Sequence, residues 1–159
     1  AGIPLARCVD AIASLRPEDK RGELIEWHGA TIINDCYNSN PEALQSMIRT
    51  LAAVPAKRRI LVAGEMLELG SRAAQLHREC GEEAAAVGID QVIGVRGLAQ
   101  EIVAGADNTA GSKTRAIFVE TPQAAGEWLK EHLKRGDAVL LKASRGVRLE
   151  QALATLTAG

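Results

Sequence analysis

Apolar residues recur with two different periods along this chain. Between Leu5 and Leu15 they come every three or four positions, which predicts a helix over residues 5–15. Residues 23–27 (ELIEW) and 30–36 (ATIINDC) are then two short, largely apolar runs, separated by His28 and Gly29. This arrangement is typical of a hairpin of two strands.

From residue 41 onward, short apolar runs alternate with longer stretches of helical period. We expect strands at 59–63, 91–95, 116–119 and 138–142, and helices at 41–51, 71–87, 97–104, 121–133 and 149–156. Strands that alternate with helices are connected by right-handed crossovers, which make the sheet largely parallel. The predicted fold class is therefore α/β: a Rossmann-like three-layer sandwich with a mainly parallel sheet of five to six strands and helices on both faces.

Composition narrows the class of protein. With 159 residues, 47% of them hydrophobic, the chain has the size of one domain and can build its own core. A net charge of -1 argues against a broad basic face for nucleic acid, and no apolar run approaches the roughly 18 residues of a membrane span. The start of the sequence lacks the pattern of a signal peptide, and three widely spaced cysteines indicate no disulfide framework. We expect a cytoplasmic monomer without membrane insertion.

Ligands of such sheets bind beyond the carboxyl ends of the strands, so the residues that follow each strand are the candidate site. Lys142, Ser144 and Arg145 follow the last apolar strand and combine an ammonium, a hydroxyl and a forked cation, which suit a carboxylate or phosphate. The other strand ends have simpler interpretations. Asn40 suits a helix cap, Glu65 a solvated loop charge, and His77 a histidine of the helix surface or the core.

Two alternative interpretations are excluded, a phosphate loop by its spacing and a phospho-receiver domain by a missing residue. Residues 111–114 (GSKT) resemble the end of a phosphate loop, but Gly and Lys are not adjacent and no strand precedes them. A phospho-receiver domain would need an Asp after its third parallel strand, where this sequence has Arg96 and Gly97. The three histidines have no metal-ligand spacing, so no metal site is predicted in this chain.

Three ordered motifs give a specific resemblance. Residues 34–41 (NDCYNSNP), residues 63–70 (AGEMLELG) with His77 downstream, and residues 136–145 (GDAVLLKASR) closely resemble the C-terminal domain of the Mur ligases. The resemblance covers about residues 20–157. It implies that residues 1–20 are the tail of a preceding central domain or a linker, and that residues 21–159 are the C-terminal domain. Ala143 stands where the family usually has Gly.

The resemblance implies an ATP-dependent ligase of peptidoglycan synthesis, an acid-amino-acid ligase that uses ATP and Mg2+. The form of the first motif is similar to that of members that add D-Ala-D-Ala to UDP-MurNAc-tripeptide. The phosphate loop and the metal ligands of the family belong to other domains, so this chain alone is expected to be inactive. By this resemblance the nucleotide-binding residues are Tyr37, Asn38, Asn40 and Glu65, the substrate-binding residues are Lys142, Ser144 and Arg145, and the catalytic residues are Lys142 and Arg145.

Two other interpretations stay open from the sequence. The related folyl- and cyanophycin-type ligases share this domain but act on other substrates. The same fold, detached, is also compatible with a binding module that performs no chemistry.

Overall fold

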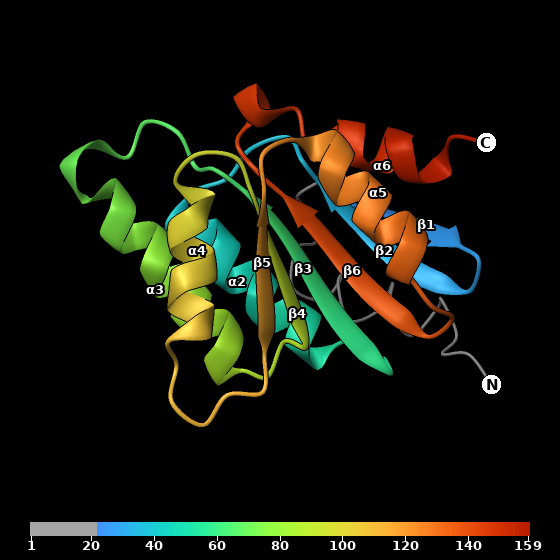
Figure 1. Ribbon diagram of the computed structural model, residues 1–159, viewed down its shortest axis with the longest axis horizontal. Coiled ribbons are helices and arrows are strands. Elements are labelled where there is room, and N and C mark those ends of the chain that lie inside the picture. The colour runs from blue at the N-terminus through green and yellow to red at the C-terminus, as the bar shows by residue number, and fades with distance from the viewer. Residues whose placement is uncertain (1–21) are drawn as a thin grey trace.

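The computed structural model describes residues 22–159 (Figure 1). The predicted helix over residues 5–15 and the assignment of residues 1–20 to a preceding domain lie outside the described residues.

A six-stranded sheet forms the centre of the domain, with the order β1-β2-β6-β3-β4-β5. β1 pairs with β2 as an antiparallel hairpin, and every other neighbouring pair is parallel. The predicted α/β fold class is confirmed. The strands are β1 (Glu23–Trp27), β2 (Ala30–Asp35), β3 (Arg58–Gly64), β4 (Gln91–Val95), β5 (Arg115–Val119) and β6 (Asp137–Lys142).

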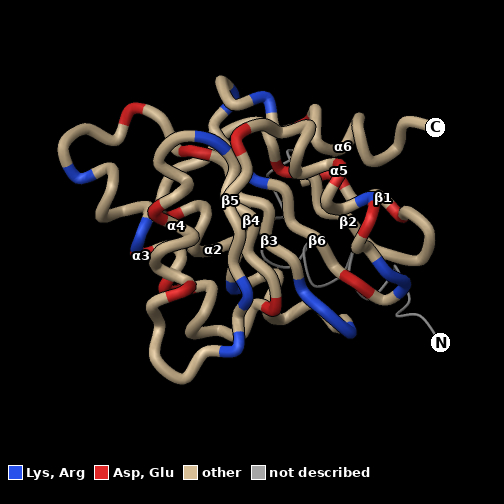
Figure 2. The backbone as a smooth tube through the Cα atoms, viewed as in Figure 1, with Lys and Arg blue, Asp and Glu red and all other residues tan. Residues whose placement is uncertain are grey.

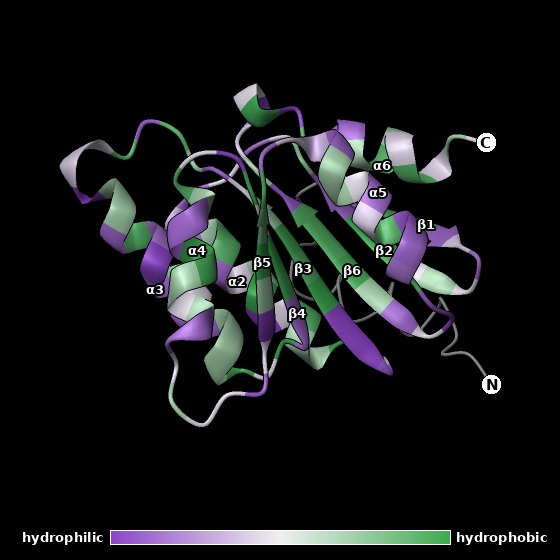
Figure 3. Cartoon of the chain, in the orientation of Figure 1, coloured by the Kyte–Doolittle hydropathy of each residue, from purple (hydrophilic) through white to green (hydrophobic). Residues whose placement is uncertain are grey.

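Helices cover both faces of this sheet and complete the predicted three layers (Figure 1). α2 (Pro41–Ala53), α3 (Ala73–Ala86) and α4 (Ala99–Asp107) pack on one face, and α5 (Pro122–His132) and α6 (Glu150–Thr157) pack on the other. Neighbouring residues of a strand point to opposite faces, so Ile33 packs under α2 while Ile32 faces α5 and α6. Both faces are apolar, and the central strands are accordingly hydrophobic along most of their length (Figure 3).

Two helices begin at the caps that the sequence predicts. The Asn40 Oδ1 atom accepts a hydrogen bond from the Ala43 N–H at 2.8 Å, and the Thr121 Oγ1 atom accepts one from the Ala124 N–H at 3.1 Å. A proline follows each cap, at the position where a missing N–H costs nothing.

Three predicted boundaries of α3 and α4 are wrong by two or three residues. Ser71 lies in a short 3-10 turn, Gly70–Arg72, and α3 begins only at Ala73. Gly97 has a φ of +53°, which is incompatible with a right-handed helix, so α4 begins at Ala99. α4 also runs three residues beyond its predicted end, so Gly105 lies within the helix, where it contacts α3.

The contact between α3 and α4 depends on two glycines. A methyl group on Gly81 would overlap the carbonyl oxygen of Ile102, and a methyl group on Gly105 would overlap that of Arg78. Each helix thus offers a glycine to the backbone of the other. The two helix axes can approach more closely than any larger side chain would allow.

Acidic and basic residues are interspersed along the backbone in Figure 2. Within residues 22–159, none of the helices combines the length and the apolar character needed to cross a membrane.

We expect Gly81→Ala to lower the free energy of unfolding by about 1–3 kcal/mol or more, because the new methyl group collides with backbone that cannot rotate away. Urea unfolding of the chain measures this. Gly22→Ala is the matched control, since no atom of residues 22–159 lies within 4 Å of the added methyl group, and it should change stability by less than about 0.5 kcal/mol. Equal stability of the two variants would contradict the close helix contact.

Candidate functional site

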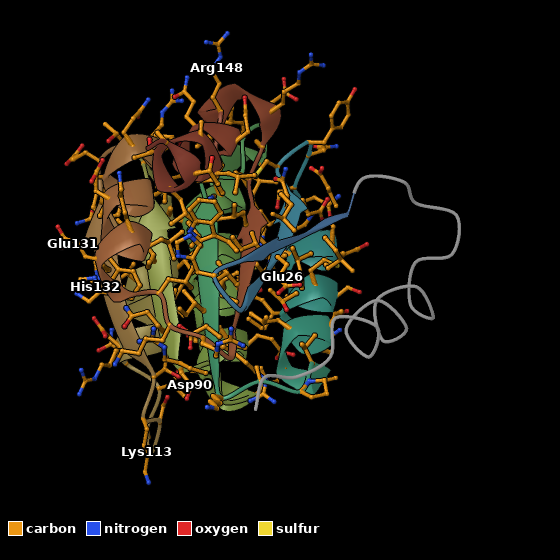
Figure 4. All side chains as sticks on the ribbon, turned by 90° about the vertical axis from the view of Figure 1, so that its right-hand side faces the viewer. Glu26, Asp90, Lys113, Glu131, His132 and Arg148 are labelled. Carbon is orange, nitrogen blue, oxygen red and sulfur yellow. The ribbon has the colours of Figure 1, made fainter. Side chains whose placement is uncertain are left out.

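The carboxyl ends of the parallel strands meet along one edge of the sheet, the upper edge in Figure 1. Three of the segments that follow these strands carry the predicted site residues: residues 36–40 after β2, residues 65–69 after β3, and residues 143–149 after β6. The segments after β4 and β5, residues 96–98 and 120–121, end at the same edge. In Figure 4, Arg148 projects from this edge, whereas Lys113 of the loop that resembles a phosphate loop lies at the opposite end. The structure therefore separates residues 111–114 from the candidate site.

A buried ion pair lies at the centre of this edge. The Lys142 Nζ atom is 2.7 Å from the Asp35 Oδ2 atom, and the two side chains are only 2% and 1% exposed. The two residues face each other directly in the register of β2 and β6. The Lys142 ammonium also donates to the carbonyl oxygen of Asn38 at 3.0 Å, which fastens the segment after β2 to β6.

Residues 36–40 form a tight loop of side-chain and backbone contacts. The Asn38 Oδ1 atom accepts a hydrogen bond from the Ser39 N–H at 2.8 Å, and the Asn40 side chain caps α2. Asn38 and Asn40 are exposed, whereas Ser39 is buried and its hydroxyl has no hydrogen-bond partner among residues 22–159. The two predicted asparagines thus lie together at the rim, although each of their side-chain oxygens already accepts a local bond.

Ser144 joins the segment after β6 to the segment after β3. Its Oγ atom accepts a hydrogen bond from the Leu67 N–H at 2.9 Å, and its own N–H donates to the Glu65 carbonyl at 3.4 Å. The Glu65 carboxylate accepts a hydrogen bond from the Leu98 N–H at 3.3 Å. It also packs so closely on Gly97 that a methyl group there would overlap it. Glu65 is therefore a partly buried link to β4 as well as a loop charge.

Arg145 and Tyr37 form the exposed part of the edge. The Arg145 guanidinium lies 5.3 Å from the centroid of the Tyr37 ring, a cation–π arrangement, and 56% of Tyr37 is exposed. A pocket of about 260 Å³ lies beside this pair. It is lined by Glu23, Asn34, Cys36, Tyr37, Arg145 and Glu150.

Cys36 contributes no nucleophile to this pocket. Burial, followed by the negative charges of Glu150 and Asp35, raises the pKa of its thiol to about 12. At neutral pH the group therefore stays protonated, and only the thiolate is a nucleophile.

The alanine at position 143 is accommodated by its neighbour. A methyl group on Gly64 would lie 2.5 Å from the Ala143 Cβ atom, so Ala143 fills the space that Gly64 leaves empty. The extra methyl group of Ala143 is therefore packed against Gly64 and does not point toward the pocket residues.

The sequence analysis assigned no role to two residues that help to build this edge. The Arg96 Nη1 atom donates to the Gly146 carbonyl at 3.1 Å, although its φ of +69° is unusual for a non-glycine residue. His77 is completely buried and contacts the segment after β3. The sequence signal for His77 was its place downstream of the second motif, and the signal for Arg96 was its position after a strand.

These features define a class of protein: an α/β domain whose strand ends carry a built polar edge with a cation, an aromatic ring and a pocket. The chain belongs to the Mur ligase family, since residues 20–145 match the Mur ligase, glutamate ligase domain. Among the described residues, the structure brings the predicted Tyr37, Asn38, Glu65 and Lys142 to one edge with Ser144 and Arg145.

Named relatives agree with this membership. The chain is 32% identical over 152 residues to the UDP-N-acetylmuramoyl-tripeptide--D-alanyl-D-alanine ligase of Bacillus subtilis, which covers 94% of this chain and 33% of that protein. The MurF ligase from Thermotoga maritima, solved in complex with ADP, superposes with a TM-score of 0.71 at 32% identity, covering 86% of this chain and 30% of that one. A MurF from Acinetobacter baumannii gives a TM-score of 0.76 at 25% identity, with the same coverage of both chains. The chain thus spans about a third of the length of these relatives.

We expect Lys142→Met to destabilise the domain by about 3–5 kcal/mol, because it takes the ammonium away from a carboxylate that stays buried. Urea unfolding measures this loss. Combining it with Asp35→Asn removes both charges, and the double variant should regain most of the stability. A single variant as stable as the original chain would show that the pair contributes nothing to folding.

Proposed function

We propose that the full-length protein containing this chain is an ATP-dependent ligase that adds D-Ala-D-Ala to UDP-MurNAc-tripeptide in peptidoglycan synthesis. The observation that carries the proposal is the match, over 94% of the chain, to a relative named for that activity. The described domain supplies one part of the active site and is not catalytic by itself. The nucleotide-sugar substrate and the reduced thiols are consistent with a cytoplasmic enzyme.

The reaction proceeds in two steps. The tripeptide carboxylate attacks the γ-phosphorus of ATP, forming an acyl phosphate as ADP leaves. The amine of D-Ala-D-Ala then attacks the acyl carbon, and a tetrahedral intermediate loses phosphate while the nitrogen gives up its proton. Positioning and charge stabilisation account for most of the rate in such a step.

Arg145 and Ser144 are the proposed contacts for the incoming dipeptide. Arg145 is exposed at the rim, and its guanidinium can hold a carboxylate through two parallel hydrogen bonds. Its position over the Tyr37 ring limits its freedom, and both residues line the pocket. The Ser144 hydroxyl accepts from Leu67, so its own hydrogen can be donated to a substrate oxygen.

The residues around Tyr37 fit a partial nucleotide contact. The exposed ring offers a face for a base, Asn38 and Asn40 are exposed beside it, and the similar Thermotoga maritima structure is an ADP complex. Within residues 22–159, no three His, Cys, Asp or Glu side chains are grouped to hold a metal ion, so no step at this edge is assigned to Mg2+.

The proposed role of Lys142 in the site is to hold the loop of residues 36–40 in place. Its ammonium is committed to Asp35 and to the Asn38 carbonyl, which supports a role in positioning that loop at the rim. Direct contact of Lys142 with phosphate charge in the transition state stays a prediction.

The proposal is tested with the purified full-length protein, ATP, Mg2+ and UDP-MurNAc-tripeptide. D-Ala-D-Ala should give the pentapeptide product and ADP, detected by mass spectrometry. A protein that joins a single amino acid to the nucleotide sugar, but not the dipeptide, would overturn the substrate assignment.

In the full-length enzyme, Arg145→Ala should lower kcat/KM for D-Ala-D-Ala by about 10- to 150-fold, since a charge-assisted hydrogen bond of about 1.5–3 kcal/mol is lost. The KM for ATP should change little. Arg148→Asn is the control: it removes a charge from the same turn, where Asn tolerates the left-handed backbone (φ +58°), and it should retain activity. Normal dipeptide kinetics in Arg145→Ala would exclude this arginine from the substrate site.

A further inference from the structure

We propose that His77 is a positioning residue whose neutral imidazole fixes residues 65–67 and, through them, Ser144 and Arg145. This inference rests on the proposed function, because it assigns His77 to the dipeptide side of the same site.

The hydrogen bonds of the ring define its protonation. His77 lies on α3 with none of its surface exposed. Its Nδ1 atom is 2.7 Å from the Ala73 carbonyl oxygen, which can only accept, so Nδ1 carries the hydrogen. Its Nε2 atom is 2.9 Å from the Met66 amide nitrogen, which can only donate, so Nε2 carries none. The ring is therefore neutral and in one tautomer, selected by a backbone group on each side.

Met66 needs this acceptor because its amide is out of reach of water. Met66 is only 2% exposed, and its hydrogen bond to His77 is buried. A buried N–H without an acceptor is costly, so the segment would have to move if the imidazole were lost.

The bond to Met66 lies between two bonds made by Ser144. Ser144 donates to the Glu65 carbonyl and accepts from the Leu67 N–H, so residues 65 and 67 are held by Ser144 while residue 66 is held by His77. The Met66 N–H and the Glu65 carbonyl belong to the same planar peptide unit, so a rotation of that unit would turn the Glu65 carbonyl away from the Ser144 N–H. It would thereby weaken a bond that holds Ser144 next to Arg145 and shift the adjoining Leu67 N–H that binds the Ser144 hydroxyl.

Two polar substitutions separate this role from general core packing. In His77→Gln the amide oxygen can take the place of Nε2 and accept from Met66. In His77→Asn the shorter side chain can reach only the Ala73 carbonyl, so the Met66 acceptor is lost. Both variants keep a buried amide at the same position, which makes them a matched pair.

The first readout is amide hydrogen exchange in the 159-residue chain, followed by NMR. In His77→Asn, exchange at Met66 and Leu67 should be faster by about tenfold or more, the size expected for one lost hydrogen bond. In His77→Gln it should stay close to the original rate, and amides of β4 provide the reference for overall stability. Equal acceleration at all these amides in both variants would reduce His77 to a packing residue and overturn the proposal.

If His77→Asn does not fold, the unsubstituted chain still tests whether His77 accepts a hydrogen bond from Met66. Its ¹⁵N spectrum at neutral pH should show an unprotonated Nε2 and a coupling across the hydrogen bond from Met66. A proton on Nε2 would overturn the proposal.

The second readout is the kinetics of the full-length enzyme. His77→Asn should raise the KM for D-Ala-D-Ala about fivefold or more with an unchanged KM for ATP, and His77→Gln should restore it, as expected when one neutral hydrogen bond is lost indirectly. If the exchange pattern is as expected but these kinetics are not, the link to the dipeptide is wrong. If the unsubstituted enzyme does not use the dipeptide, the proposed function fails while the positioning of residues 65–67 stands.

Discussion

The buried pair of Lys142 and Asp35 is the constraint on which the candidate site depends. Both charges are removed from water, which is costly unless each is held by an opposite charge and further hydrogen bonds. The pair satisfies this condition only when β6 lies directly beside β2 in the observed register. The same ammonium binds the Asn38 carbonyl, so strand pairing and the shape of the rim are set by one group. A slip of β6 by one residue would point Lys142 to the other face of the sheet.

Local features of the fold could be predicted because local chemistry decides them. The pairs Asn40-Pro41 and Thr121-Pro122 mark helix starts, since a side-chain oxygen and a missing N–H are both suited to the first turn. The order of the strands is different. Every central strand is a short apolar run, so nothing in its residues distinguishes β3 from β6 as the neighbour of β2. The place of β6 between them is a long-range outcome of packing.

In the candidate site, too, the local features could be predicted from the sequence and the long-range contacts could not. The sequence predicts that Lys142, Ser144 and Arg145 gather at a strand end, because parallel strands share an edge. It does not predict that Lys142 turns inward to Asp35 while Arg145 stays exposed. His77 shows the limit most clearly, since its partner Met66 is eleven residues away across a loop and no periodicity connects them.

The hairpin has a mechanical consequence. Because β1 is antiparallel to β2, Glu23 pairs with Asn34, and the backbone therefore passes through Gly22 beside the polar edge rather than at the far end of the sheet. Among residues 22–159, no atom lies within 4 Å of a methyl group placed on Gly22, so none of these residues packs against that position. Any rotation of the domain about Gly22 would move the residues of the polar edge only a short distance, and would move Lys113, at the far end in Figure 4, much further.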